Sequence, residues 1–348
     1  RHDLTPYIKD HQLEWIAPDS GWIATIVTRE EHGLDWMNPA VADRWIDSVW
    51  GPYLSKMSEY IGNTLAGYVQ DELDVLSGDI IVSPSLLERF VENKGYDPHQ
   101  DLIALFHDIG QRTDKFRCDY YEIMCELLEE NIYSRISGWH EDRGMLYGSV
   151  AVRGRQDILA ETSHFGDLFS LLRWYHFPGN EDPQVEPKVP PRRRFIDAKL
   201  SSSAAHIFQR QRAAVCAYWG AGWGMTMEQW FAWTNENYAY GLNLFDPHLA
   251  PYTMGAGWYE WVPPAHYFYQ PYWEHFRWFS EYVRRLSYMM SQGVHRPDLA
   301  ILFPTTTIHA NWTRGHRYNL AADIAASATY NMADSLYTGG LDFDFIDD

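Results

Sequence analysis

The sequence predicts an α/β protein: a TIM (β/α)8-type barrel that lacks its first strands in this chain, followed by the beginning of a second α/β domain. Three observations lead to this fold class. Apolar strand-like runs alternate with helical patterns along most of the 348 residues, as in βα units with a parallel sheet. Fewer than eight such strands precede residue 295. No GxGxxG or GxxxxGK[ST] phosphate loop occurs, which weighs against the alternative of an open doubly wound sheet.

The predicted strands come first, because their number decides the type of barrel. Apolar runs of strand length occur at residues 22–28, 64–70, 145–152, 173–177, 212–218 and 240–246. A complete barrel needs eight strands. The simplest interpretation is that strands one and two precede Arg1, so that residues 64–70 form the fourth strand and residues 212–218 the seventh.

Helical patterns separate these strands. They cover residues 39–62, 84–94, 98–109, 114–143, 201–210, 226–239 and 271–292. Thr226 and Gln229 have the spacing of a capping box. Residues 180–197 hold four prolines and many charges, which predicts a surface insertion.

A new strand–helix–strand pattern begins near residue 298. It consists of a strand at 298–304, a helix at 318–337 and a strand at 343–346. The prediction therefore divides the chain into a barrel domain, residues 1–295, and the opening of a second domain, residues 296–348.

Composition and charge limit the partners. The net charge of −19, from 28 basic and 47 acidic residues, repels phosphate backbones, so no nucleic acid is expected. No apolar stretch has the length to span a bilayer. Aromatic residues make up 16% of the chain, which fits either a sugar-stacking surface or a large aromatic core. The location, secreted, periplasmic or cytoplasmic, stays open because the chain opens on Arg1 and shows no signal peptide. The oligomeric state stays open too.

The ends of barrel strands hold the candidate catalytic residues. The fourth predicted strand ends in Asp71-Glu72, and neighbouring side chains there point to opposite sides, so that one can face the cleft. The alternative is that these acids cap a helix. The seventh predicted strand ends at Cys216, which is either a small core residue or a cleft residue. Tyr218, Trp219 and Trp223 follow it and are candidate sugar-binding residues.

Other candidates lie in neighbouring loops. Asp246 and His248 end the eighth predicted strand, where His248 is either a sugar contact or a satisfied core group. Glu161 lies in the loop after the fifth strand and can swing into a cleft or stay solvated. Arg153, close to that strand, can hold an anionic substrate group or pair with surface acids. Tyr259 and His266 complete the candidate substrate-binding set.

Five stretches resemble glycosyl hydrolases close to the α-L-rhamnosidases of family 106. They are GYVQDEL (67–73), LLRWYHFPGNED (171–182), KLSSSAAHIFQRQRA (199–213), GLNLFDPHLAPYTMGAG (241–257) and the long segment PPAHYFYQPYWEHFRWFSEYVRRLSYMMSQG (263–293). The resemblance implies a retaining or inverting glycosidase barrel followed by a flavodoxin-like domain, in enzymes longer than this chain. Some relatives use calcium, so it allows a calcium ion, although the sequence has no dedicated calcium motif and no metal ligand is assigned.

The chain departs from the resembled pattern at two acidic positions. Val215-Cys216 stands where the family has Ser-Glu, and the segment from Gly148 to Arg153 replaces a Gly-His-Leu-x-x-Glu motif. Asp71-Glu72 is retained.

The sequence thus predicts a glycoside hydrolase acting on plant or microbial oligo- or polysaccharides, with Glu72 as acid/base. Its nucleophile would be Cys216 or a loop carboxylate such as Glu161. The alternatives are a catalytically inactive carbohydrate-binding protein or an active-site-altered variant.

Overall fold

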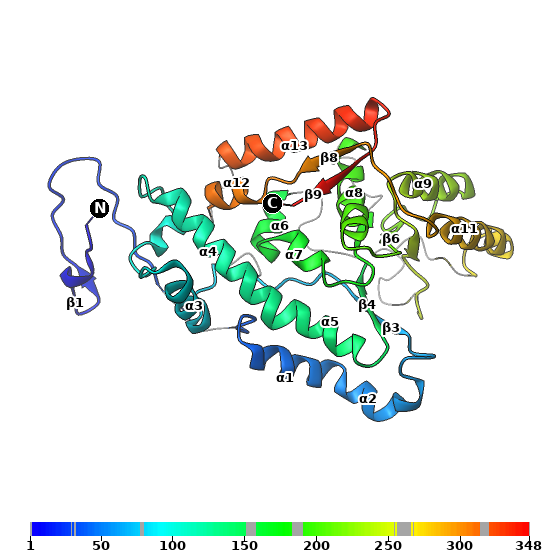
Figure 1. Cartoon of the computed structure of the whole chain (residues 1–348), viewed down its shortest axis with the longest axis horizontal. Coiled ribbons are helices and arrows are strands. Elements are labelled where there is room, and N and C mark those ends of the chain that lie inside the picture. Colours follow the sequence, from blue (N-terminus) through cyan, green and yellow to red (C-terminus); the bar gives the residue numbers. More distant parts are fainter. Residues whose placement is uncertain are drawn as a thin grey trace.

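The structure is a computed structural model that describes residues 2–28, 30, 33–76, 80–150, 158–182, 191–253, 255, 266, 268–313 and 320–347. A short antiparallel hairpin, β1 (Ile8–Lys9) and β2 (Gln12–Leu13), lies near the N-terminus, at the left of Figure 1. The prediction of a strand at 22–28 is wrong: these residues form no strand and are all exposed. An apolar run needs a neighbouring strand or core to become a sheet strand, and this run packs against neither.

The helix predicted at 39–62 is broken into separate pieces. They are α1 (Pro39–Val49), α2 (Gly51–Met57) and a 3₁₀ turn (Ser58–Tyr60). The break falls at Trp50-Gly51-Pro52, where Pro52 has no N–H to donate. Asn38 caps α1 by accepting from the N–H of Ala40 at 3.0 Å.

The first parallel strand pair is β3 (Gly67–Gln70) with β4 (Leu146–Ser149). The crossover between them contains α3 (Pro84–Lys94), a 3₁₀ turn (Leu102–Leu105), α4 (Thr113–Leu128), a π turn (Glu129–Tyr133) and α5 (Ser134–Glu141). The prediction of one long helical pattern at 114–143 is confirmed, whereas the helix predicted at 98–109 is reduced to the 3₁₀ turn.

The second parallel group is β5 (Gly179–Asp182), β6 (Ala214–Ala217) and β7 (Leu244–Pro247), in that spatial order. Residues 173–177, predicted as a short strand or extended segment, form no strand: α7 (Leu168–Leu172) ends just before them and the strand begins at Gly179. The surface insertion predicted at 180–197 is wrong at both ends, and residues 183–190 lie outside the described residues. Asn180 and Glu181 are buried in β5, and α8 (Pro191–Ile207) begins inside the proline-rich run, with Pro191 at its first position.

Backbone contacts join the two groups of strands. An isolated parallel bridge links Gly148 of β4 to Phe177, and the N–H of Cys216 donates to the carbonyl of Val150 at 3.1 Å. The described residues therefore supply five parallel strands of a βα sheet, not a closed barrel. Helices pack on one face of this sheet, and a small separate cluster of Val150, Phe177, Ala214 and Cys216 lies on the other.

Three further helices are found among the described residues of this part of the chain. They are α6 (Ile158–Phe165), which was not predicted, α9 (Met227–Ala239) and α11 (Phe276–Met290). The capping box of Thr226 and Gln229 is confirmed at the start of α9. Figure 1 places α9 and α11 together at one end of the molecule, with α1 and α2 along its lower side. None of the described helices combines the length and the apolar character that crossing a bilayer requires.

The predicted strand–helix–strand unit after residue 298 is confirmed, with one extra helix. It consists of β8 (Leu299–Leu302), α12 (Thr305–Asn311), α13 (Leu320–Thr338) and β9 (Phe343–Ile346), and β8 pairs with β9 in parallel. Its core side chains join the same hydrophobic cluster as the earlier helices. The N–H of Phe345 donates to Ser203 Oγ at 2.9 Å, and Arg117 Nη1 donates to the Ala310 carbonyl at 3.1 Å. The domain boundary at 295/296 stays a prediction.

Gly179 gives the sheet a direct test. A Cβ on Gly179 would lie 2.1 Å from the carbonyl oxygen of Ser149 and 2.8 Å from Cβ of Ala214. We expect Gly179→Ala to lower the free energy of unfolding by about 1–3 kcal/mol, because backbone must move to relieve the overlap. Urea unfolding followed by circular dichroism measures this change.

Gly138→Ala is the matched control. Gly138 lies in α5, and nothing would lie within 4 Å of its added Cβ. This variant should gain about 0.4–1 kcal/mol through the lower entropy of the unfolded chain. Equal stability of the two variants would contradict the close packing of β5 between its neighbours.

Candidate functional site

Chemically active side chains follow the carboxyl ends of the parallel strands, where βα folds place their sites. These residues are Asp71 and Glu72 after β3, Glu181 near the end of β5, Cys216 and Tyr218 at the end of β6, and Asp246 and His248 at the end of β7. The sequence predicts these residues at strand ends, and the structure places Asp71, Glu72, Cys216, Asp246 and His248 at the carboxyl-end edge of the sheet.

A row of three side chains crosses the sheet. In the strand register Glu181 pairs with Cys216, and Cys216 pairs with Asp246. Residues opposite one another in a parallel sheet point to the same face. Because Cys216 belongs to the small cluster on the face without the large helical core, Glu181 and Asp246 lie on that face as well. The thiol therefore has a carboxylate-bearing residue on each neighbouring strand.

Asp71 and Asp246 interact electrostatically although they lie on strands at opposite edges of the sheet. Burial by surrounding protein raises the pKa of Asp246, and the negative charge of Asp71 raises it further. The Asp246 side chain still reaches solvent. In a flat sheet with the order β3, β4, β5, β6, β7, the strands β3 and β7 would be four strand spacings apart, roughly 19 Å at about 4.8 Å each. Their interaction indicates that the sheet curves, as a barrel wall does.

Two residues after strand ends have left-handed backbone. The φ angle is 41° at Glu72 and 72° at Tyr218. Bulky residues rarely adopt this region, and such conformations concentrate at functional sites. At Tyr218 the strained backbone turns the ring into the core, where it packs against Trp230 with ring centroids 4.1 Å apart.

Two of the expected sugar-binding residues are core residues instead. Tyr218 is fully buried, and its hydroxyl is hydrogen-bonded to Thr234. His266 is also buried; its ring lies 4.0 Å from that of Trp230, and burial lowers its pKa to about 3. Aromatic packing against Trp230 and Phe276 or Phe279 covers both rings, and their role in sugar binding stays a prediction.

Other expected binding residues are accessible. Trp219 and Trp223 lie in the loop after β6, and Trp223 is 39% exposed. Trp219 makes an edge contact with His248, with ring centroids 6.5 Å apart. Burial lowers the pKa of His248, which keeps its imidazole neutral near pH 7. These three rings form the accessible aromatic side of the site.

Three predicted site residues lie wholly or partly outside the described residues. Glu161 belongs to helix α6 rather than to the predicted loop, and its side chain lies outside the described residues. Arg153 and Tyr259 also lie outside the described residues.

Glu181 is the site residue that the sequence interpretation missed. It is only 8% exposed and lies next to the last residue of β5, yet Gly-Asn-Glu-Asp (179–182) has the composition of a loop. The signal was the apolar run Trp174–Phe177 directly before it, which the interpretation took for the strand itself. The predicted strand begins six residues before the observed strand β5. The prediction therefore places Glu181 in a surface insertion and not at a strand end.

The described side chains that could together hold a metal ion come from α8, β9 and the segment before β8. Calcium takes six to eight oxygen ligands. Within the described ranges, one group of His, Cys, Asp or Glu residues has donor atoms close enough to share a metal ion. This group is His206, His295 and Asp344. That group lies away from the strand ends described above and contains two nitrogen donors. The calcium expectation from the family resemblance stays a prediction.

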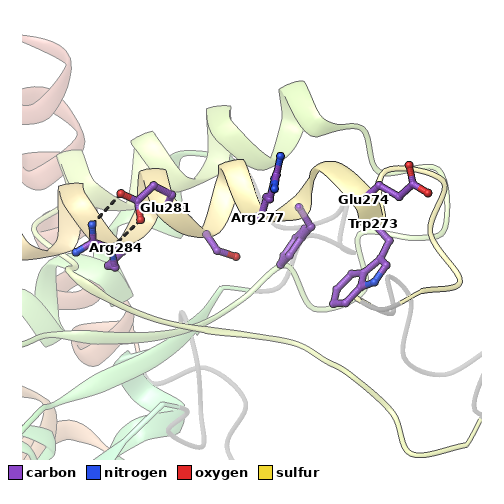
Figure 2. A pocket seen from close by; sticks show the side chains of 7 residues that line it. Trp273, Glu274, Arg277, Glu281 and Arg284 are labelled. Carbon is purple, nitrogen blue, oxygen red and sulfur yellow. Dashed lines mark hydrogen bonds and ion pairs between the residues drawn. The ribbon is translucent and has the colours of Figure 1, made fainter.

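Two grooves lie along α11 beside the site. The first, of about 590 Å³, is lined by Trp273, Glu274, Phe276, Arg277, Ser280, Glu281 and Arg284. Figure 2 shows Glu281 paired with Arg284, and this pairing, together with Arg285, lowers the pKa of Glu281 to about 2. The second groove, of about 250 Å³, reaches Phe245 and Pro247 of β7. Neither groove is lined by the strand-end carboxylates.

Comparisons with known proteins show the fold. No protein-family description matches the sequence, and no curated protein matches it either. Among solved structures, the chain is similar to a rhamnosidase from Novosphingobium sp. PP1Y, with a TM-score of 0.67 at 16% identity. It is also similar to Gan42B, a GH42 β-galactosidase, with a TM-score of 0.55 at 10% identity.

The lengths of these matches differ strongly. The similarity covers 90% of this chain but only 29% of the rhamnosidase chain, and 92% of this chain but 51% of the β-galactosidase chain. The chain therefore spans less than a third of one neighbour and about half of the other. It has an α/β fold of the kind found in glycoside hydrolases.

The raised pKa of Asp246 leads to a test of the site's electrostatics. A carboxyl whose pKa is higher in the folded state than in the unfolded chain destabilises the fold once it is ionised. We expect Asp246→Asn to raise the melting temperature near pH 7. The gain should shrink as the pH falls through the raised pKa towards the ordinary value of 3.8. Thermal unfolding over a pH series measures it.

The variant Asp71→Asn tests the same interaction from the other residue. Removing this charge should lower the pKa of Asp246, which carboxyl NMR titration detects directly. The exposed Asp298 supplies the control, because Asp298→Asn should leave that titration unchanged. An Asp246 pKa that does not respond to Asp71→Asn would contradict the interaction between the two strand ends.

Proposed function

We propose that this chain contains the catalytic face of a glycoside hydrolase that cleaves glycosidic bonds of oligo- or polysaccharides. One observation carries the proposal: Asp71 and Asp246 form an interacting carboxylate pair at the carboxyl ends of parallel strands. Glycosidic hydrolysis needs two carboxyl groups with different tasks. The fold that the chain shares with a rhamnosidase and a β-galactosidase supports this reading.

In this proposal the two tasks are divided between Asp246 at the end of β7 and the neighbouring acids Asp71 and Glu72 after β3. Asp246, with its raised pKa, holds a proton to higher pH and suits the general acid that protonates the leaving glycosidic oxygen. Glu72, the acid/base of the sequence prediction, then takes the second role beside Asp71. It either activates water that adds to the anomeric carbon or attacks that carbon itself. The C–O bond breaks, and the proton from Asp246 leaves with the aglycone.

Cys216 fits a nucleophile poorly. A nucleophilic cysteine needs a nearby cation, helix N-terminus or metal to favour the thiolate. The register instead places Glu181 and Asp246 beside it, and negative neighbours disfavour a further negative charge at Sγ. Glu181, buried on the same face, becomes the better candidate for a third acidic group.

Sugar binding is assigned to the accessible rings of Trp219, Trp223 and His248. Indole faces stack on the apolar faces of pyranose rings, and a neutral imidazole can donate and accept hydrogen bonds with hydroxyls. The printed names of the two structural neighbours make aryl α-L-rhamnosides and aryl β-D-galactosides the first substrates to test.

A second function has one observation in its favour. Cys216 occupies a strand-end position where the resembled family has a glutamate, so the site lacks one acid of the expected set. A carbohydrate-binding protein without turnover would bind oligosaccharide in calorimetry and release no product.

Removing the proposed general acid tests the first function. Asp246→Asn should lower kcat/KM for nitrophenyl glycosides by about 10²–10⁴-fold. The loss should be smaller for a dinitrophenyl glycoside, because its aglycone leaves without protonation. Glu72→Gln should lower both rates alike. Steady-state release of the phenol measures these effects.

Glu88→Gln, on the exposed side of α3, is the matched charge control and should retain full activity. If the loss in Asp246→Asn is the same for both leaving groups, Asp246 is not the general acid. Sugar binding without product at any concentration of the chain would favour the binding protein.

The thiol has its own test. If Cys216 only fills its strand position, Cys216→Ala keeps activity within about threefold, and alkylation of the wild type has no effect on it. Cys216→Glu adds the acid that the family resemblance places there, and activity appearing only in this variant would identify the natural chain as inactive. Loss of activity on both Cys216→Ala and alkylation would restore the thiol nucleophile.

A further inference from the structure

A group of charged and imidazole side chains lies outside the strand-end site, where the C-terminal unit contacts α8. His206 comes from α8, His295 from the segment between α11 and β8, and Asp344 from β9. One donor atom from each residue can be chosen so that all lie within 4.8 Å of one another. Three chain segments far apart in sequence thus meet at one point.

The contacts within this group are short. His206 Nδ1 lies 2.9 Å and 3.1 Å from the two carboxylate oxygens of Asp344. The rings of His206 and His295 are stacked with centroids 4.1 Å apart and an interplanar angle of 10°. His295 Nε2 lies 2.9 Å from Asp342 Oδ2, so a second carboxylate borders the group.

We propose that His206, His295 and Asp344 bind a divalent transition metal ion of the zinc class. Two imidazoles and a carboxylate are a donor set that zinc takes up readily, whereas calcium and magnesium prefer oxygen alone. The site is separate from the proposed glycosidase carboxylates and does not depend on the proposed function.

Binding requires a small rearrangement. Two ligand atoms about 2.1 Å from a tetrahedral zinc ion are roughly 3.4 Å apart, so the widest separation here must shorten. The stacked rings must also tilt, because each nitrogen lone pair lies in the plane of its own ring. His295 can make this change: it lies outside helices and strands, and its side chain is 28% exposed. Asp344, buried on β9, and His206, on α8, form the fixed side.

In this proposal Lys199 lowers the affinity of the site for a metal ion. Its Nζ atom, almost fully buried, lies 3.0 Å from Asp342 Oδ1 and 3.7 Å from Asp344 Oδ1. The ammonium group neutralises part of the charge that would attract a metal ion and repels the ion itself. Ser203 also donates to Asp344 Oδ1, at 3.1 Å, and holds that carboxylate in place. A metal ion therefore competes with a lysine already present in the fold.

A bound ion would connect α8 to the β8–β9 unit. Metal ligands drawn from distant segments couple binding to folding, because the unfolded chain does not hold them together. The metal would therefore stabilise the attachment of the C-terminal unit to the helices around the sheet.

The test uses the whole chain, stripped of metal by chelator and titrated with Zn²⁺ in a calorimeter. We expect one equivalent to bind with a Kd below about 10 μM. Co²⁺ should give the visible absorption of a tetrahedral ion, and Zn²⁺ should raise the melting temperature. His295→Gln and Asp344→Asn should weaken binding more than tenfold, and Lys199→Met should tighten it. Circular dichroism of the His295→Gln variant shows whether the variant is still folded.

His99→Gln is the matched control, because His99 is an exposed imidazole next to Asp97 and distant in sequence from the group. It should leave Zn²⁺ binding unchanged. Binding that survives in both His295→Gln and Asp344→Asn would overturn the proposal by assigning the ion to surface residues. Absence of stoichiometric binding in the wild type and in Lys199→Met would overturn it as well.

Discussion

The close approach of β5 to its neighbours is the constraint on which the rest of the structure depends. Gly179 sits where any Cβ would overlap the backbone of β4 and a side chain of β6. The contact fits the register observed for β5 against β6 and for β6 against β7. Because a shift by one residue would turn every side chain to the other face, this register decides that Glu181, Cys216 and Asp246 share one face.

Acidic side chains grouped on that face destabilise the folded state electrostatically. Burial and the nearby negative charge of Asp71 both disfavour ionisation of Asp246, which is why the pKa of Asp246 is raised. Left-handed backbone at Glu72 and Tyr218 adds strain at the same strand ends. Costs of this kind are usual where side chains are arranged for chemistry rather than for stability. The aromatic core of Trp230, Tyr218 and Phe279 behind β6 and α9 supports the strained loop.

The C-terminal unit is held by polar contacts as well as by the shared core. Asp344 receives hydrogen bonds from Ser203 and His206, and the Lys199 ammonium lies between Asp342 and Asp344. Together with His206 and nearby charges these contacts lower the pKa of Asp344 despite its burial. A buried carboxylate with several partners fixes orientation, because few arrangements satisfy it.

The sequence by itself determined the α/β class, most helix positions and four of the five parallel strands, because periodicity and capping residues are local signals. It also placed Asp71, Glu72, Cys216 and Asp246 at strand ends. Only the tertiary structure decided that 22–28 is no strand, that β5 begins at Gly179 and carries Glu181, and that Tyr218 and His266 are core residues. Each of these outcomes depends on contacts with distant parts of the chain. Residues 22–28 have no neighbouring strand to pair with, and β5 places its acidic residue on a face shared with β6 and β7. The rings of Tyr218 and His266 are covered by other aromatic rings.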